Sequence, residues 1–275
     1  MKFFATLFGA GLVCLSSLAA TGLPISPPDF HLLPLSVIEQ RLKDAPRSNI
    51  LRERALKYLF KQAGCAKLAE QKVNPGQPPN VICTLPGETS SLIIVGGHLD
   101  HVRRGNGIVD DWSGASMLPS LYQSVRGDER RHTFLFIGFT EEEKGLVGSK
   151  YYVDHLSKEE LHQIRAMVNL ECLGMGAPEV WQDHADPRLL VVLDDVAKSM
   201  GTYFPAVNLA GVGRDDAMSF RDRKVPTITI HSLTQGTVRV LHSSRDTFAA
   251  EDMTYYYGSY RLVLRYLTRL DEALP

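Results

Sequence analysis

The stretch Leu92-Ile-Ile-Val-Gly-Gly97 decides the fold, and it leads directly into His98-Leu99-Asp100. Similar short apolar runs recur along the chain, at Val81–Leu85, Phe134–Phe139, Ala166–Leu170 and Thr227–Ile230. They alternate with helix-like segments, a pattern that is typical of a largely parallel sheet covered by helices on both faces. The sequence therefore predicts a three-layer α/β fold around a mixed, mostly parallel sheet.

Several of the intervening segments carry helix boundary signals. Residues 49–62 have apolar side chains near helical spacing, and Gly64 stands where a C-terminal cap belongs. Further helix starts are indicated by Ser36, by the capping box of Ser157 and Glu160, by Asp186 before Pro187, and by Asp252 before the run to Leu270. We expect these helices to cover the sheet.

Composition excludes several classes of protein. The 275 residues are 44% hydrophobic and 22% charged, which is the balance of a core-forming globular chain rather than of a disordered, collagen-like or coiled-coil one. The formal charge of −1 provides no overall field toward nucleic acid or anionic lipid. We therefore expect no nucleic-acid partner, and any function must come from a local site.

Residues 1–20 read as a secretory signal peptide, because Lys2 precedes an apolar run that ends in small residues. An uncleaved anchor is the alternative, but the uninterrupted apolar stretch is shorter than the ~20 residues that span a bilayer. We expect cleavage after Ala19 or Ala20, no stable membrane insertion afterwards, and a secreted, periplasmic or extracellular protein. Residues 21–275 are predicted to form a single catalytic domain, and the sequence carries no signal for an oligomeric state.

Three cysteines remain after cleavage. In an oxidising compartment Cys65 and Cys83 could pair and close a short loop, while two free buried thiols are the alternative. Cys172 is expected to stay unpaired.

Acidic and histidine residues follow the apolar runs, where the carboxyl ends of parallel strands form a ligand-binding rim. The residues at these positions are His98 and Asp100, Glu141 to Glu143, Glu171 and, further on, His242. Asp110 and Asp111 lie in a glycine-bounded turn between the first two runs. Imidazole and carboxylate oxygen are the ligands of catalytic zinc sites, so the rim predicts a metal centre.

Neighbouring residues acquire different expected roles at such a centre. Asp100 is placed to orient the imidazole of His98, Glu143 to bind metal, and Glu142 to act as the general base. The alternatives are structural: the three glutamates could form a solvated acidic turn, and Asp110 could cap the helix that begins near Trp112. Asp111 could provide that cap while Asp110 binds metal.

Five segments together resemble peptidase family M28, the co-catalytic zinc exopeptidases. They are GGHLD (96–100), GIVDDWSG (107–114), EEEKGLVGS (141–149), NLECLG (169–174) and LHSSRDT (241–247). The resemblance implies a sheet of about eight strands, two zinc ions bridged by Asp110, and a cis peptide bond between Asp110 and Asp111. Glu143 and His242 would complete one ion's ligands, and His98 and Glu171 the other's.

The chain departs from the family pattern at three places. Glu171 stands where many relatives have aspartate, Asp215-Asp216-Ala217 replaces a Ser-Asp-His segment, and Leu241 replaces a tyrosine that some secreted members carry. The side-chain pocket is expected to draw on residues 201–220, which precede the last apolar run.

The resemblance implies a secreted metallo-aminopeptidase that hydrolyses N-terminal residues from peptide substrates. One alternative is a glutaminyl cyclase, which resembles this family, works with one zinc ion and would need little from His98. A second alternative is a metal-free binding domain that has kept the fold and lost catalysis.

Overall fold

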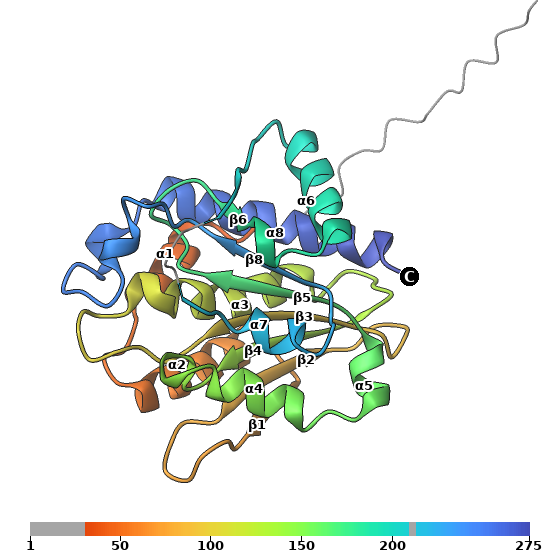
Figure 1. Cartoon of the computed structure of the whole chain (residues 1–275), viewed down its shortest axis with the longest axis horizontal. Coiled ribbons are helices and arrows are strands. Elements are labelled where there is room, and N and C mark those ends of the chain that lie inside the picture. The colour runs from red at the N-terminus through yellow and green to blue at the C-terminus, as the bar shows by residue number, and fades with distance from the viewer. Residues whose placement is uncertain (1–30, 209–212) are drawn as a thin grey trace, which may run out of the picture.

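An eight-stranded sheet forms the centre of the computed structural model, which describes residues 31–208 and 213–275 (Figure 1). The strand order across the sheet is β1-β2-β4-β3-β5-β8-β6-β7. The strands are β1 (Lys67–Gln71), β2 (Asn80–Leu85), β3 (Leu92–His98), β4 (Thr133–Phe139), β5 (Ile164–Glu171), β6 (Glu179–Trp181), β7 (Ala206–Val207) and β8 (Thr227–His231). The predicted signal segment, residues 1–20, lies outside the described residues.

The four central strands run parallel, and antiparallel pairing begins on either side of them. Strand β3 pairs in parallel with β4 and β5, and β5 with β8. Strands β1 and β2 are antiparallel on one flank, and β6 lies antiparallel to β8 on the other. The predicted mixed α/β sheet is confirmed, and all five apolar runs are strands.

Sequence reasoning missed β1, β6 and β7, which all lie toward the edges of the sheet. Strand β1 has no fully buried residue, and β6 and β7 have only three and two residues. An edge strand needs no continuous apolar run, so these strands carry little of the signal that identified the central ones.

Helices cover both faces of the sheet. They are α1 (Leu35–Lys43), α2 (Asn49–Gln62), α3 (Ser113–Val125), α4 (Val147–Asp154), α5 (Lys158–Gln163), α6 (Pro187–Ser199), α7 (Ala217–Arg221) and α8 (Met253–Ala273). Side chains of α1, α2, α3, α6 and α8 share one buried cluster with Ile93 and Val95 of β3. Ile94 faces the opposite cluster, with side chains of α4 and α7, which lie in front of the sheet in Figure 1. This alternation along β3 produces the predicted three layers.

Most of the expected helix boundaries are present, although α1 begins at Leu35, one residue before the predicted Ser36, with Pro34 as its N-cap. Helix α2 spans the predicted residues, and Gly64 adopts the left-handed conformation (φ +86°) of a C-terminal cap. Ser157 and Glu160 form the capping box, with the Glu160 N–H donating to Ser157 Oγ at 3.1 Å. Asp186 and Asp252 accept from the first turns of α6 and α8.

A disulfide joins Cys65, just after α2, to Cys83 in β2, and Cys172 is buried and free. Of the two possibilities that the sequence left open for the first pair, the structure shows the bonded one. In the described part of the chain, no helix has both the length and the apolar character that crossing a bilayer requires.

Candidate metal centre

The predicted site residues come together at the carboxyl end of the central strands. His98 ends β3, Glu171 ends β5, and Glu142 and Glu143 follow β4. Because these strands are parallel, their last residues meet at one rim of the sheet. Asp110 arrives from the turn before α3, and His242 from the loop after β8, so elements far apart in sequence converge here.

His98, Asp110 and Glu171 form the first group of potential ligands. His98 Nε2 lies 3.1 Å from Asp110 Oδ1 and 3.4 Å from Glu171 Oε1. The imidazole is fully buried. His98 Nδ1 lies 3.1 Å from the main-chain oxygen of Asp100, so a neutral ring donates its proton there and leaves a bare Nε2 facing the two carboxylates.

Asp110, Glu143 and His242 form the second group. His242 Nε2 lies 3.1 Å from Asp110 Oδ2 and 2.8 Å from Glu143 Oε2. The other oxygen of Glu143, Oε1, is buried and has no hydrogen-bond partner within the described residues. Asp110 thus presents one carboxylate oxygen to each histidine.

The two groups fit a pair of divalent cations. In each group the ligand atoms lie within 4.8 Å of one another. Two ligands bound at about 2.0 Å to a tetrahedral zinc ion lie about 3.3 Å apart, close to the separations found here. The donor set of imidazole nitrogen and carboxylate oxygen is the one that zinc takes at catalytic sites. Asp110 belongs to both groups, as a carboxylate that bridges two ions would.

The charges of these groups shift one another's pKa values. Burial lowers the pKa of His98, but the carboxylates of Glu171, Asp100 and Asp110 outweigh it and leave the pKa well above its usual value. Hydrogen bonds to Asp110 and Glu143 raise the pKa of His242 to about 10. Both imidazoles therefore favour a positive charge between the acidic side chains, a preference that a metal ion would also satisfy.

Glu142 lies beside the first group, with Oε2 4.0 Å from His98 Nε2. Its side chain is 12% exposed. Burial, together with the charges of Asp216, Glu171 and Asp110, raises the pKa of Glu142 to about 10. A buried carboxyl group whose pKa is this strongly perturbed by its charged neighbours is a candidate functional group.

Asp100 contacts both His98 and the Glu142–Glu143 main chain. The main-chain carbonyl of Asp100 accepts the hydrogen bond from the imidazole of His98. The carboxylate of Asp100 lies 3.6 Å from the same nitrogen, Nδ1. That carboxylate instead accepts the N–H groups of Glu142 at 3.0 Å and Glu143 at 3.3 Å. The side chain of Asp100 therefore positions the predicted base and ligand, a contact that sequence reasoning did not foresee.

Asp111 ties the loops of the site together. It accepts the N–H of Gly114 in the first turn of α3 at 3.0 Å, as expected of a cap. It also accepts the N–H groups of Cys172 at 3.0 Å and His98 at 3.1 Å. The peptide bond between Asp110 and Asp111 is cis, as the family resemblance implied.

Arg52 is a buried charge that sequence reasoning missed. Its guanidinium donates to the carbonyls of Pro46 at 3.0 Å and Gly107 at 2.8 Å, and also to the carbonyl of Asn106. Burial lowers its pKa to about 10. Arg52 therefore fixes the turn before Asp110. From the sequence alone, a charged residue in an amphipathic helix is expected to lie on the surface.

A cavity of about 120 Å³ opens beside the two groups. Four of the predicted ligands line it, namely Asp110, Glu143, Glu171 and His242. The other lining residues are Glu142, Cys172, Trp181, Gly213, Arg214, Asp215, Thr229, His231, Leu233 and Leu241. The segment 201–220 contributes three of these residues, as predicted for a side-chain pocket, and residues 209–212 lie outside the described chain. Sequence reasoning missed His231, although it follows an apolar run just as His98 and Glu171 do.

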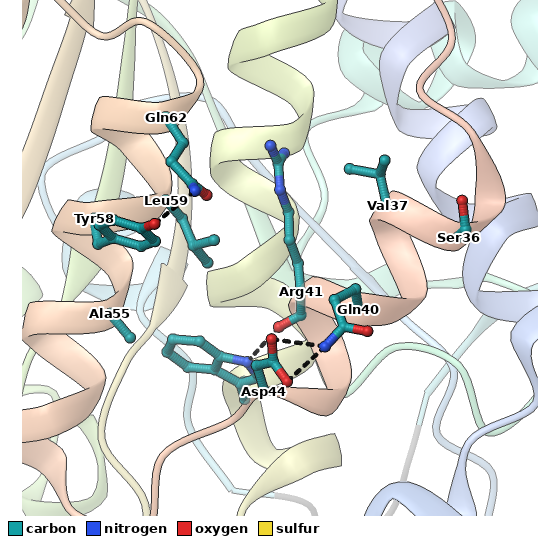
Figure 2. Close-up of a pocket in the computed structure, with 10 residues that line it drawn as sticks. Ser36, Val37, Gln40, Arg41, Asp44, Ala55, Tyr58, Leu59 and Gln62 are labelled. Atoms are coloured by element: carbon teal, nitrogen blue, oxygen red, sulfur yellow. Dashed lines mark hydrogen bonds between the residues drawn. The ribbon is translucent and has the colours of Figure 1, made fainter.

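A larger cavity of about 580 Å³ lies elsewhere, between α1 and α2 (Figure 2). Its lining includes Arg41, Asp44 and Tyr58 and contains no histidine. Asp44 accepts from Gln40, and Tyr58 bonds to Gln62, so these polar groups satisfy one another. The smaller cavity, where metal-binding groups converge, is the better candidate for chemistry.

Comparisons with known proteins agree with this geometry. The chain is 30% identical over 150 residues to leupeptin-inactivating enzyme 1 of Streptomyces exfoliatus, a match that covers 54% of this chain and 34% of that protein. The chain thus spans about a third or less of the curated relatives that it matches.

Two solved structures share the fold. LapA aminopeptidase of Legionella pneumophila superposes with a TM-score of 0.75 at 20% identity, over 87% of this chain and 71% of that one. An Acidobacteriales bacterium glutaminyl cyclase superposes with a TM-score of 0.71 at 19% identity, over 86% of this chain and 93% of that one.

The family is shown by a match over most of the chain. The model of peptidase family M28 matches residues 80–267, which include all five segments at the rim. This chain belongs to peptidase family M28.

Proposed function

We propose that this chain is a secreted, zinc-dependent aminopeptidase that removes N-terminal residues from peptides. The observation that carries the proposal is the convergence of two ligand groups on a shared Asp110, with Glu142 beside them. In an inactive binding domain of this fold, nothing would preserve a complete ligand set together with a buried acid.

The proposed ligands are His98, Asp110 and Glu171 for one zinc ion, and Asp110, Glu143 and His242 for the other. When bound, two such ions would lower the pKa of a shared water and polarise the scissile carbonyl. The unpartnered Glu143 Oε1, and the Nε2 of His98 that faces the carboxylates of Asp110 and Glu171, are the groups that would gain most from the cations.

Glu142 is the proposed general base and acid. It would take the proton from the attacking water and return it to the nitrogen of the leaving peptide. The two N–H groups held by Asp100 fix the main chain from which Glu142 and Glu143 project, so the base and the neighbouring ligand keep a constant relation.

The proposed exopeptidase action follows from the size and charge of the cavity. A space of about 120 Å³ is of a size to hold one side chain. The free amino group of the substrate would lie toward His98 and Glu171, where carboxylates favour a positive charge. The disulfide between Cys65 and Cys83 is consistent with export to an oxidising compartment.

The central experiment is the Glu142→Gln variant of the zinc-loaded protein, assayed on leucyl-aminomethylcoumarin. We expect zinc content to stay the same and kcat to fall by roughly 10²–10⁴-fold, the usual contribution of acid–base catalysis. Glu141→Gln is the matched control, because Glu141 bonds to Asn74 and Lys144 instead of facing the ligands. Near-normal turnover by Glu142→Gln would reject this base.

A glutaminyl cyclase remains the second candidate, because the chain spans 93% of the Acidobacteriales enzyme and a smaller share of LapA. A one-zinc cyclase would not need the complete group formed by His98 and Glu171. Cyclisation of an N-terminal glutamine peptide with loss of ammonia, undiminished in His98→Ala, would favour this candidate. Release of free glutamine, abolished in His98→Ala, would favour the aminopeptidase.

A further inference from the structure

One side chain of the cavity has a hydrogen-bond donor that the proposed mechanism does not use. His231, the last residue of β8, is 1% exposed. Its Nδ1 accepts the N–H of Leu233 at 3.0 Å, so this nitrogen carries no proton. A neutral ring then carries its proton on Nε2. Burial lowers the pKa of His231 to about 4, so the ring is neutral at neutral pH.

The Nε2–H of His231 is buried and has no partner among the described residues. A buried donor without an acceptor is costly, and such groups are rare in folded proteins. Because His231 lines the cavity, an occupant of the cavity is placed to supply the acceptor.

The same cavity also contains a buried hydrogen-bond acceptor. Asp215 lines the same cavity and is 2% exposed. Its carboxylate accepts the hydroxyl of Thr229 at 2.7 Å and the N–H of Met218 at 3.3 Å. Since a carboxylate offers about four acceptor positions, Asp215 can accept further bonds.

The strand sets the spacing between donor and acceptor. Thr229 and His231 are two residues apart in β8, so their side chains project from the same face, roughly 7 Å apart. Asp215 is bonded to Thr229 and therefore lies beside His231 along that face. Such a gap accommodates a planar group that accepts a hydrogen bond at one end and donates at the other.

We propose that this cavity selects substrates whose N-terminal residue carries a carboxamide side chain, with glutamine as the best fit. The amide oxygen accepts the Nε2–H of His231, and the amide nitrogen donates to Asp215. Trp181 and Leu233 supply apolar walls for the methylene groups. This inference rests on the proposed function, which places the N-terminal residue in the cavity.

Other N-terminal side chains of a substrate leave His231, Asp215 or both without a suitable hydrogen-bond partner. Leucine satisfies neither group, glutamate brings a negative charge to Asp215, and lysine offers His231 no acceptor. A site built to hydrogen-bond a substrate group rejects an analogue that lacks it more strongly than an apolar pocket rejects a shorter side chain.

The first test compares kcat/KM for glutaminyl-, leucyl- and glutamyl-aminomethylcoumarin in the zinc-loaded protein. We expect glutamine to be preferred, and His231→Phe to reduce the glutamine-to-leucine ratio of kcat/KM by about 10–100-fold. Asp215→Asn should relax the discrimination against glutamate. His184→Phe is the matched control, because His184 stacks on Trp181 from outside the cavity lining and should leave both ratios unchanged.

Two further measurements do not depend on turnover. Calorimetry on the zinc-loaded protein should show tighter binding of L-glutamine than of L-leucine, with the difference lost in His231→Phe. Nitrogen-15 NMR of histidine-labelled wild-type protein should show His231 neutral and protonated on Nε2, which keeps the proposal testable even if His231→Phe fails to fold.

The outcomes separate the inference from the function on which it rests. Hydrolysis with no glutamine preference, unchanged in His231→Phe, overturns the inference and leaves the aminopeptidase proposal standing. If the protein hydrolyses none of the substrates, the aminopeptidase proposal is overturned. Calorimetry then decides the inference, and equal affinity for L-glutamine and L-leucine overturns it. A His231 ring protonated on Nδ1 also overturns it.

Discussion

Replacing Asp100 with asparagine tests how the site positions its base. The carboxylate accepts the N–H of Glu142 at 3.0 Å and that of Glu143 at 3.3 Å, one on each oxygen. Asparagine keeps one acceptor and turns the other position into a donor that faces an N–H group. The Asp100 main-chain carbonyl, which bonds to His98 Nδ1, is unchanged by the substitution.

The expected decrease in kcat is worked out from the loss of one of the two hydrogen bonds to the Asp100 carboxylate. A hydrogen bond to a charged group contributes about 1.5–3 kcal/mol, and at about 1.4 kcal/mol per tenfold this corresponds to a decrease in kcat of about 10–100-fold. We expect KM to change little, because the substrate cavity is not lined by Asp100. Zinc should remain at two ions per chain, because both ligand groups are intact.

The assay is kcat and KM on leucyl-aminomethylcoumarin, with zinc measured on the same sample. Asp44→Asn is the control, because Asp44 accepts only the side chain of Gln40 at the surface cavity. Loss of one zinc ion with little change in the remaining site would show that the carboxylate orients His98 instead. Unchanged kcat and zinc content would refute any positioning role.

Three further predictions concern stability, each measured by urea unfolding. Replacing both Cys65 and Cys83 by serine should lower the free energy of unfolding by about 3 kcal/mol for a loop of this length. Because the folded-state pKa of His231 is about 4 against an ordinary 6.5, the unfolded chain takes up the proton first. Stability should therefore fall as the pH drops from 6.5 toward 4, by about 1.4 kcal/mol per pH unit, and His231→Phe should show a shallower decline. Arg52→Lys should cost about 2–4 kcal/mol, because one ammonium cannot reach all the carbonyls that the guanidinium fork holds, and unchanged stability would show that those bonds contribute nothing.

Strand ends encode the part of the site that the local sequence predicts most directly. A fully buried parallel strand requires a continuous apolar run, so the run marks the strand and the next polar residue marks the rim. His98 and Glu171 are found in this way. The same rule applies to His231, which the local sequence marks as clearly as the others but which has no place in the recognised family segments.

Contacts that depend on the path of the main chain are not encoded locally. Whether the carbonyl or the carboxylate of Asp100 faces His98 is decided by how the loop after β3 meets the loop after β4. Arg52 belongs to an amphipathic helix, and the carbonyl groups of the Gly107 turn approach and cover its guanidinium. Neither relation leaves a periodic signal in the chain.

The structure also explains how the ligands are brought together before any cation binds. Asp111 accepts the N–H of His98 itself and the N–H of Cys172, the residue after Glu171. It also holds the first turn of α3, which begins just after Asp110 and Asp111. One carboxylate thus bonds the main chain at His98, the main chain next to Glu171, and the first turn of α3. Because hydrogen bonds to the main chain do not depend on the metal, the fold itself supplies the preorganisation that a two-ion site requires.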